Sequence, residues 1–353
     1  MEENTQIENE KYFAAANTYK GFKSYFSEIF PPEKFDSIYV IKGGPGTGKS
    51  SLMKKVAAHF YKKECNIEEI YCSSDPNSLD GIICKHGEKK IALIDGTSPH
   101  ETDARIPGAI DEIINLGDNW DKRWLNAKRE DILALNTEKR TAYKTAYSYL
   151  KIAGECANFI VKTLKEKFDF SKAHCVISEF CQKLSPNNTE FVQTRLLSSF
   201  GKYGEFKLDT LKKKADYFVS VSGNEFIGLI LIEELLKHID VLRISRTEFP
   251  LALDPSYHDA VYIPDAKTAF ALDSAADIVA DEFLKSNLGN DNERIKNAKS
   301  IREIAMDEAK RWFAIASDLH FRLEDIYSHT MSFEKNDILV AEKITEIENI
   351  LEV

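Results

Sequence analysis

The sequence has no apolar run long enough to cross a bilayer as a helix. Such a helix needs roughly 20 consecutive apolar residues, and the longest apolar stretch, Ile227–Leu236, is interrupted by Glu233 and Glu234. The first residues, MEENTQIENEK, are acidic where a signal peptide would be basic and then apolar. We therefore expect no membrane insertion and a cytoplasmic location.

Cysteine pairs with a functional spacing are also missing. The six cysteines form no C-x-x-C pair and no zinc-binding pattern, so neither a redox pair nor a zinc finger is predicted. We expect free thiols in a reducing compartment. They are Cys65, Cys72, Cys84, Cys156, Cys175 and Cys181.

The sequence also lacks an excess of basic residues. The net charge is −10, which argues against broad coating of nucleic acid, because such coating needs a basic surface to displace counterions. Residues 1–186 contain 27 basic and 27 acidic residues, and residues 187–353 contain 20 and 30. The whole charge imbalance therefore lies in the second half, and we do not expect nucleic acid as a partner.

What is present is a phosphate-binding pattern. Ile38–Ile41 is a β-branched and aromatic run typical of a buried strand, and residues 50–60 have the composition of a helix. The residues between them fit G-x-x-x-x-G-K-[ST], the Walker A loop, in which backbone amides and a helix N-terminus bind phosphate. We expect Lys49 to reach the β- and γ-phosphates of ATP and Ser50 to ligate Mg²⁺. The nucleotide-binding residues are Gly43, Gly44, Pro45, Gly46, Thr47, Gly48, Lys49, Ser50 and Ser51.

A carboxylate for the magnesium ion follows a second apolar strand. Ile91–Ile94 ends in Asp95, at the strand edge where open α/β sheets bind ligands. We predict that Asp95 is a catalytic and metal-binding residue, as in a Walker B strand. Gly96 stands where many ATPases carry a water-activating Glu. Another residue must therefore activate the attacking water, or turnover is slow. His100 and Glu101 are candidates for it, the alternative being that they only cap a turn at Pro99.

Five short segments recur in the same order, which indicates a tandem repeat. The matches are Tyr39–Gly44 with Phe218–Gly223, Asp75–Ile83 with Asp254–Tyr262, Ile91–Asp95 with Ala269–Asp273, Ile152-Ala153 with Ile315-Ala316, and Phe170–Lys172 with Phe333–Lys335.

In the second copy the phosphate loop is degenerate. Gly228 takes the position of Lys49, and Leu229 that of Ser50. We therefore predict an α/β protein with two tandem P-loop NTPase-like domains, each a mainly parallel sheet flanked by helices. Residues 1–186 would form the nucleotide-binding domain and residues 187–353 a degenerate, non-binding domain.

An Asp-Pro pair and apolar residues at helical spacing predict where several helices begin and extend. Asp75 followed by Pro76 is predicted as a helix N-cap, a structural role that we favour over a catalytic one because Asp254-Pro255 repeats it. A short helix is predicted over residues 107–116. Apolar residues at helical spacing predict two long helices, over residues 143–168 and 304–326.

The full pattern resembles an uncharacterised bacterial family of tandem P-loop ATPases within the P-loop NTPase superfamily. In that family the second half commonly carries its own phosphate loop. This sequence departs from the family pattern at Gly223–Leu229, which argues against a two-site mechanism. The resemblance is carried by Ala16-Asn-Thr18, Gly21-Phe22, the Gly43–Ser50 loop, Asp75-Pro76 and Asp95–His100.

Three functions fit the sequence. The first is a magnesium-dependent ATPase whose hydrolysis drives a change between the halves, acting on an unknown protein partner. The second is a phosphotransferase with a small-molecule acceptor, for which Arg105, Lys122 and Arg123 are the clustered candidates. The third is a nucleotide-gated binding module with little turnover.

No LSGGQ, NKxD or DEAD-box motif is present, which argues against ABC transporters, small GTPases and DEAD-box helicases. An arginine finger, whose positive charge would stabilise the transferred phosphoryl group, is not assigned. The candidates are Arg105, Arg195 and Arg246.

Overall fold

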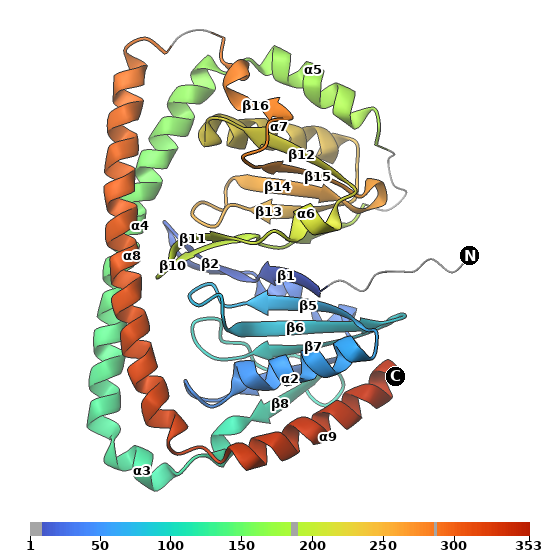
Figure 1. Ribbon diagram of the computed structural model, residues 1–353, viewed down its shortest axis with the longest axis vertical. Coiled ribbons are helices and arrows are strands. Elements are labelled where there is room, and N and C mark those ends of the chain that lie inside the picture. The colour runs from blue at the N-terminus through green and yellow to red at the C-terminus, as the bar shows by residue number, and fades with distance from the viewer. Residues whose placement is uncertain (1–8, 185–189, 286–287) are drawn as a thin grey trace.

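Two six-stranded sheets lie one above the other along the long axis of the molecule, and two long helices run beside both (Figure 1). The computed structural model describes residues 9–184, 190–285 and 288–353. The chain is an α/β protein with two sheet-centred units. The predicted domain boundary between residues 186 and 187 falls in 185–189, outside the described residues.

The first sheet is mixed. Five of its strands point the same way, in line with the predicted parallel arrangement, but β6 runs antiparallel to both of its neighbours. The strand that contains Ile38–Ile41 lies between two neighbours and is buried on both faces along these residues, as its β-branched composition predicts. In spatial order the strands are β1 (Asn9–Phe13), β5 (Asn66–Tyr71), β6 (Leu79–His86), β7 (Lys89–Asp95), β4 (Ser37–Lys42) and β8 (Asp111–Asn115).

The second sheet repeats this order and these directions. Its fourth strand along the chain, β14, is antiparallel to both neighbours as β6 is, and the outer pairs are parallel. In the matching order the strands are β9 (Val192–Thr194), β13 (Arg246–Pro250), β14 (His258–Ile263), β15 (Thr268–Leu272), β12 (Tyr217–Ser222) and β16 (Ile278–Val279). The predicted tandem repeat is therefore present in the strand topology.

A hairpin follows the first strand of each sheet, and the two hairpins lie between the units. The Phe13 amide donates to the Leu196 carbonyl at 2.9 Å, and both side chains belong to one core shared by the units. The hairpins are β2 (Ala15–Thr18) with β3 (Gly21–Ser24), and β10 (Ser198–Gly201) with β11 (Gly204–Lys207). The short helices are α1 (Phe26–Ile29), η1 (Pro32–Lys34), η2 (Leu116–Asn119), α3 (Lys122–Ala127), α6 (Thr210–Lys214), η3 (Pro264–Ala266) and η4 (Ala280–Phe283).

The two long predicted helices are confirmed as α4 (Arg129–Lys167) and α8 (Asp291–Ser328), which pack along each other beside both sheets (Figure 1). After each of them the chain crosses to the other unit. Helix α5 (Phe170–Cys181) packs on α7 (Glu225–Val241) of the second sheet, and α9 (Phe333–Leu351) packs on α2 (Lys49–Lys62) of the first. Each unit is therefore built from both halves of the chain.

Matching β-bulges show how the halves correspond. Asp80 is the unpaired residue of a bulge between β5 and β6, and Asp259 has the same place between β13 and β14. Counted along the ladders from these bulges, Asp95 at the end of β7 corresponds to Leu272 at the end of β15. The predicted match of Asp95 with Asp273 is wrong by one residue, because the β14–β15 hairpin is two residues shorter than the β6–β7 hairpin.

The helix predicted over residues 107–116 is wrong. Strand β8 occupies Asp111–Asn115 and pairs in parallel with β4. Ile114 is buried while Ile113 is 50% exposed, the alternation of an edge strand. The Asp111 carboxylate accepts hydrogen bonds from the Arg105 and Ile106 amides, which closes the preceding loop.

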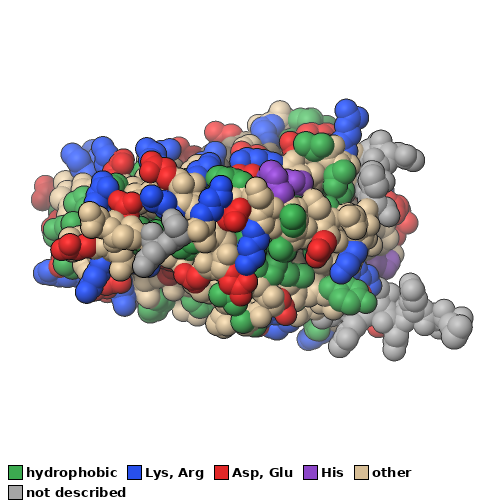
Figure 2. Space-filling model, turned by 90° about the horizontal axis from the view of Figure 1, so that it is seen from above, with side chains coloured by type: hydrophobic (Ala, Val, Ile, Leu, Met, Phe, Trp, Pro, Cys, Tyr) green, Lys and Arg blue, Asp and Glu red, His purple; other side chains and the backbone are tan. Residues whose placement is uncertain are grey.

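Among the described residues, no helix is long and apolar enough to span a membrane. Figure 2 shows the molecule from above, toward the second unit. On this face Lys and Arg side chains are interspersed with Asp and Glu. The acidic excess of the second half is therefore not gathered into a single patch on the face shown.

Candidate functional site

The Gly43–Ser50 loop connects β4 to α2, as predicted. Gly46 and Gly48 have φ values of 69° and 89°, a left-handed conformation that favours glycine. Gly48 is the N-cap of α2, so the amides that follow it lack intrahelical acceptors. Thr47 Oγ1 donates to the Gly44 carbonyl at 2.8 Å and holds the turn closed. The loop thus presents backbone amides and a helix N-terminus, a combination that favours anions.

Lys49 and Asp95 come together at this loop. The Lys49 ammonium donates to the carbonyls of Gly43 and Gly44, at 3.1 and 2.9 Å. It lies 3.6 Å from Asp95 Oδ2, and both side chains are nearly buried. Two residues predicted from separate motifs therefore share one site.

Asp95 is held in place by its own turn. Its Oδ1 accepts hydrogen bonds from the Thr97 amide and hydroxyl, at 2.9 and 2.6 Å, which leaves Oδ2 directed at Lys49. Ser50 Oγ accepts from the Leu79 amide at 2.9 Å. Ser51 is exposed on α2. Carboxylate and hydroxyl oxygens are ligands that suit Mg²⁺.

His100 and Glu101 lie in different environments. His100 is buried, stacks on Phe26 at 4.5 Å and has Nε2 3.1 Å from Asp80 Oδ2. Burial opposes its charged form, but the carboxylates of Asp80 and Asp95 outweigh burial and raise the pKa of His100 above its usual value. Glu101 is exposed. The ring of His100 is thus directed at Asp80, the bulge residue, and the roles predicted for His100 and Glu101 stay predictions.

The His100–Asp80 pair gives a pH-dependent stability. Because the folded protein raises the pKa of His100, the pair stabilises the fold fully below the unfolded value of about 6.5. This contribution is lost as the pH rises through the raised pKa. We expect the His100→Asn variant to lose more unfolding free energy at pH 6 than at pH 9, measured by urea denaturation. An equal loss at both pH values would contradict a charged pair.

Residues of the second half cover the outer side of the phosphate loop. Asn336 at the start of α9 donates from Nδ2 to the Thr47 carbonyl at 3.0 Å and accepts from Asn119 at 2.9 Å. Gly46 lies against the backbone of Glu324 on α8, because a side chain at Gly46 would place its Cβ 2.5 Å from the Glu324 carbonyl oxygen. The last turns of α8 are therefore seated directly against the loop.

Further charged groups surround this contact. Asp75 does not cap a helix, so that prediction is wrong: its Oδ1 accepts from the Asn77 amide in a turn between β5 and β6, at 3.1 Å. Lys202 Nζ lies 3.7 Å from Asp75 Oδ2. Burial, together with the charges of Lys139 and Lys49, lowers the pKa of His320 to about 4.

Among the described residues of the second half, no pair corresponds to Lys49 and Asp95. Gly228, which the sequence match places opposite Lys49, faces Leu272, and a Cβ at Gly228 would lie 2.4 Å from Leu272 Cδ2. Helix α7 begins at Glu225, three residues before Gly228, whereas α2 begins at Lys49 itself. The residues that would form a phosphate loop are therefore wound into the first turn of α7.

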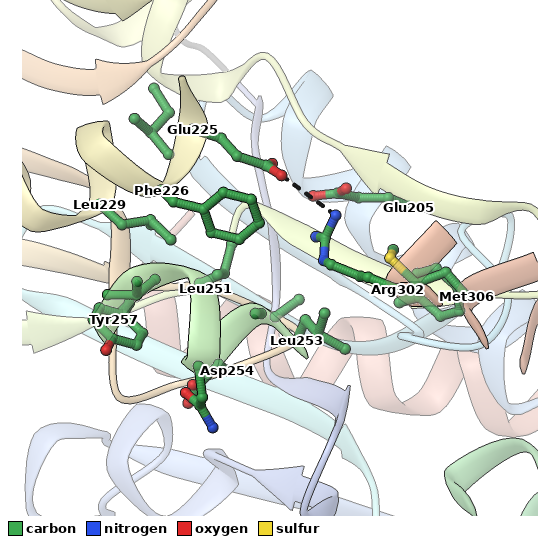
Figure 3. A pocket seen from close by; sticks show the side chains of 16 residues that line it. Glu205, Glu225, Phe226, Leu229, Leu251, Leu253, Asp254, Tyr257, Arg302 and Met306 are labelled. Carbon is green, nitrogen blue, oxygen red and sulfur yellow. Dashed lines mark ion pairs between the residues drawn. The ribbon is translucent and has the colours of Figure 1, made fainter. Parts of the chain in front are cut away.

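A small, mainly apolar cavity of about 40 Å³ occupies this position in the second unit (Figure 3). Arg302 on α8 points toward Glu225 and lies 3.3 Å from it. Asp281 Oδ2 accepts from the Asn224 amide at 2.9 Å. Carboxylates of the protein itself thus lie at the start of α7, where a phosphate would otherwise meet the amides.

Sequence reasoning missed the contacts that the second half makes with the loop. Glu324 and Asn336 follow no motif, and each is more than 270 residues away from Gly46 along the chain. The match of Phe170 with Phe333 was a usable signal, since these residues begin α5 and α9. It showed that the helices correspond, but not that they exchange units.

No protein-family model, curated protein or solved structure matches the chain. The site therefore has to be interpreted from its own chemistry. A glycine-rich turn at a helix N-terminus, a nearly buried lysine and a carboxylate at a strand end can bind a phosphate chain together with a divalent cation.

Proposed function

We propose that the chain is a magnesium-dependent ATPase of the P-loop class with a single site at Gly43–Ser50. The observation that carries the proposal is the position of Lys49, held at the N-terminus of α2 between two loop carbonyls and the Asp95 carboxylate. A lysine in this place supplies positive charge to the β- and γ-phosphates. The second half is proposed to be a non-binding, regulatory domain.

The donor set fits a magnesium ion. Ser50 offers a hydroxyl and Asp95 a carboxylate, both of them hard oxygen ligands. When bound, the ion would neutralise charge on the phosphates. Asp95 is balanced by Lys49 in the present arrangement, and its second oxygen is fixed by Thr97, so the carboxylate is oriented before any ion arrives.

The contacts of α8 and α9 support coupling between nucleotide and domain arrangement. The Glu324 backbone lies against Gly46, and Asn336 Nδ2 donates to the Thr47 carbonyl, so a phosphate chain that reshapes the loop would change its contact with both helices. Hydrolysis would then allow the contact to re-form. This feature also suits a nucleotide-gated binding module, the low-turnover alternative.

The phosphotransferase alternative receives less support. It needs an acceptor pocket lined by cationic groups, but the Arg105 guanidinium donates to the Phe30 carbonyl. Lys122 and Arg123 are exposed on the short helix α3. These three residues therefore do not form a pocket for an acceptor.

Titration calorimetry with a non-hydrolysable ATP analogue and Mg²⁺ tests the proposal. We expect a stoichiometry of one, because Gly228 and Leu272 replace the lysine and the carboxylate in the second unit. A stoichiometry of two would contradict the single site, and absence of binding would overturn the proposal. Phosphate release without any acceptor then separates the ATPase from a phosphotransferase, and binding without release points to the gated module.

A further inference from the structure

Lys202 stands out among the charged residues near the phosphate loop, because it comes from the other half of the chain. It occupies the turn of the β10–β11 hairpin, between Gly201 and Gly204. Its side chain is 11% exposed. Its ammonium lies 3.7 Å from Asp75 Oδ2, longer than a direct hydrogen bond, and 4.5 Å from the centre of the Phe321 ring. A nearly buried lysine whose carboxylate partner lies at this distance can bind another anion.

The surroundings of Lys202 concentrate positive charge. Lys139, Lys49 and Lys202 all disfavour the charged form of His320. Phe321, against which the Lys202 ammonium lies, is three residues before Glu324 on α8, and the Glu324 backbone lies against Gly46 of the loop. Lys202 and Lys49 are therefore on opposite sides of the same contact between α8 and the loop, and they come from opposite halves of the chain.

The internal repeat supplies a comparison at the degenerate site. The hairpin pairings Thr18–Gly21 and Gly201–Gly204 place Tyr19 in the position of Lys202. The Tyr19 hydroxyl accepts a hydrogen bond from Asn158 at 3.2 Å. The hairpin that reaches the intact loop thus carries a lysine, and its counterpart, near Asp254 of the degenerate site, carries a tyrosine.

The long helices show the same asymmetry. With the offset of 163 residues that relates α5 to α9, His320 and Glu324 on α8 correspond to Ala157 and Val161 on α4. Ala157 and Val161 line the small apolar cavity of the second unit. At these two helix positions, polar side chains therefore face the loop that retains Lys49, and apolar ones face the degenerate site.

None of the candidates for an arginine finger can take this role. Arg195 is paired with Glu68 at 2.9 Å, and Arg105 is bound to the Phe30 carbonyl. Arg246 is enclosed by carboxylates, with Glu190 at 2.6 Å. Each guanidinium is therefore already bound to another group of the protein.

We propose that Lys202 contacts the terminal phosphate of a nucleotide bound at Gly43–Ser50, so that the site is completed by the second half. The inference rests on the proposed ATP binding. In the hydrolytic step a water oxygen bonds to the γ-phosphorus while the bond to the β–γ bridging oxygen breaks. The electron pair leaves with ADP, and the water proton passes to the released phosphate. Lys202 would stabilise the charge on the transferred phosphoryl group.

The test compares Lys202→Ala with Lys20→Ala, its neighbour in the matching hairpin turn, which is exposed near the degenerate site. We expect Lys202→Ala to lower kcat roughly 100-fold. Its affinity for the ATP analogue should fall while its affinity for ADP stays within about threefold, because ADP lacks the terminal phosphate. Lys20→Ala should match the native protein in every measurement.

A second variant keeps the test decisive if alanine disturbs packing on Phe321. Lys202→Gln retains part of the aliphatic chain, and thermal unfolding reports whether it is folded. A folded glutamine variant with native kcat and a native preference for the ATP analogue over ADP would overturn the role of Lys202. If the native protein itself binds no ATP analogue, the proposed function fails instead. Partial recovery in Lys202→Arg would support a role for the charge.

Discussion

Replacing Lys49 with alanine is expected to weaken ATP binding roughly 100-fold or more. The ammonium spans two loop carbonyls and the Asp95 carboxylate, so its loss removes the positive charge from the loop and leaves Asp95 uncompensated. A bound triphosphate would then face a nearly buried carboxylate with no cation between them. Both the affinity for the ATP analogue and phosphate release should fall, measured by calorimetry and by a phosphate assay.

The matched control is Lys62→Ala, which removes an exposed lysine from the same helix. It changes the net charge equally but lies at the far end of α2, so nucleotide binding should remain native. Thermal unfolding should show both variants folded, because the polar contacts of the Lys49 ammonium are with the loop carbonyls and Asp95 rather than with the core. Native affinity in a folded Lys49→Ala protein would remove the main support for the proposed site.

The phosphate loop and Asp95 could be predicted because each is a local pattern. A strand, a glycine-rich turn and a helix start follow one another within residues 38–60, and their geometry depends on φ angles that glycine favours. Asp95 ends a strand adjacent to β4, so parallel pairing alone brings it to Lys49. Such arguments need no knowledge of the rest of the chain.

Register was harder to predict than topology. The second-half carboxylate that resembles Asp95 in sequence is Asp273, but the ladder places Leu272 there. A one-residue shift moves a side chain to the opposite face of a strand. The length of the β14–β15 hairpin, which decides the shift, is not visible from similarity of the strands. The corrected register strengthens the prediction of a degenerate site, since the metal carboxylate is lost along with the lysine.

The exchange of helices α5 and α9 between the two units could not be predicted from the sequence, for a different reason. Helix α9 carries an apolar face that fits any sheet-covering position, and nothing in its residues distinguishes the first sheet from the second. The choice is made by the long helix before it. Helix α8 runs past both units, so the chain arrives beside α2 when α9 begins (Figure 1).

This exchange explains how the degenerate half can matter to the intact site. Asn336 donates to the Thr47 carbonyl from the first turns of α9, and the Glu324 backbone lies against Gly46 in the last turns of α8. Any displacement of these helices by a nucleotide would be carried along α8, which packs on α4 over its length. Under the proposed function, these contacts give the second half a direct connection to the state of the loop.

Ile347→Ala in α9 should destabilise the protein by about 2–5 kcal/mol, the usual cost of truncating a buried isoleucine. Ile347 is fully buried in the core of the first unit together with Leu52 and Val56 of α2, although it belongs to the second half of the chain. Urea denaturation should show a lower midpoint with an unchanged slope. The variant should also bind the ATP analogue less tightly, because α9 positions Asn336 against the loop.

Ile338→Ala is the matched control, since this isoleucine lies on the same helix and is 61% exposed. Its unfolding free energy should stay within about 0.5 kcal/mol of the native value, and its affinity for the analogue should be unchanged. Equal effects of the two substitutions would mean that α9 does not complete the first unit. A loss confined to Ile347→Ala, in both stability and affinity, would show that the second half maintains the phosphate loop through this helix.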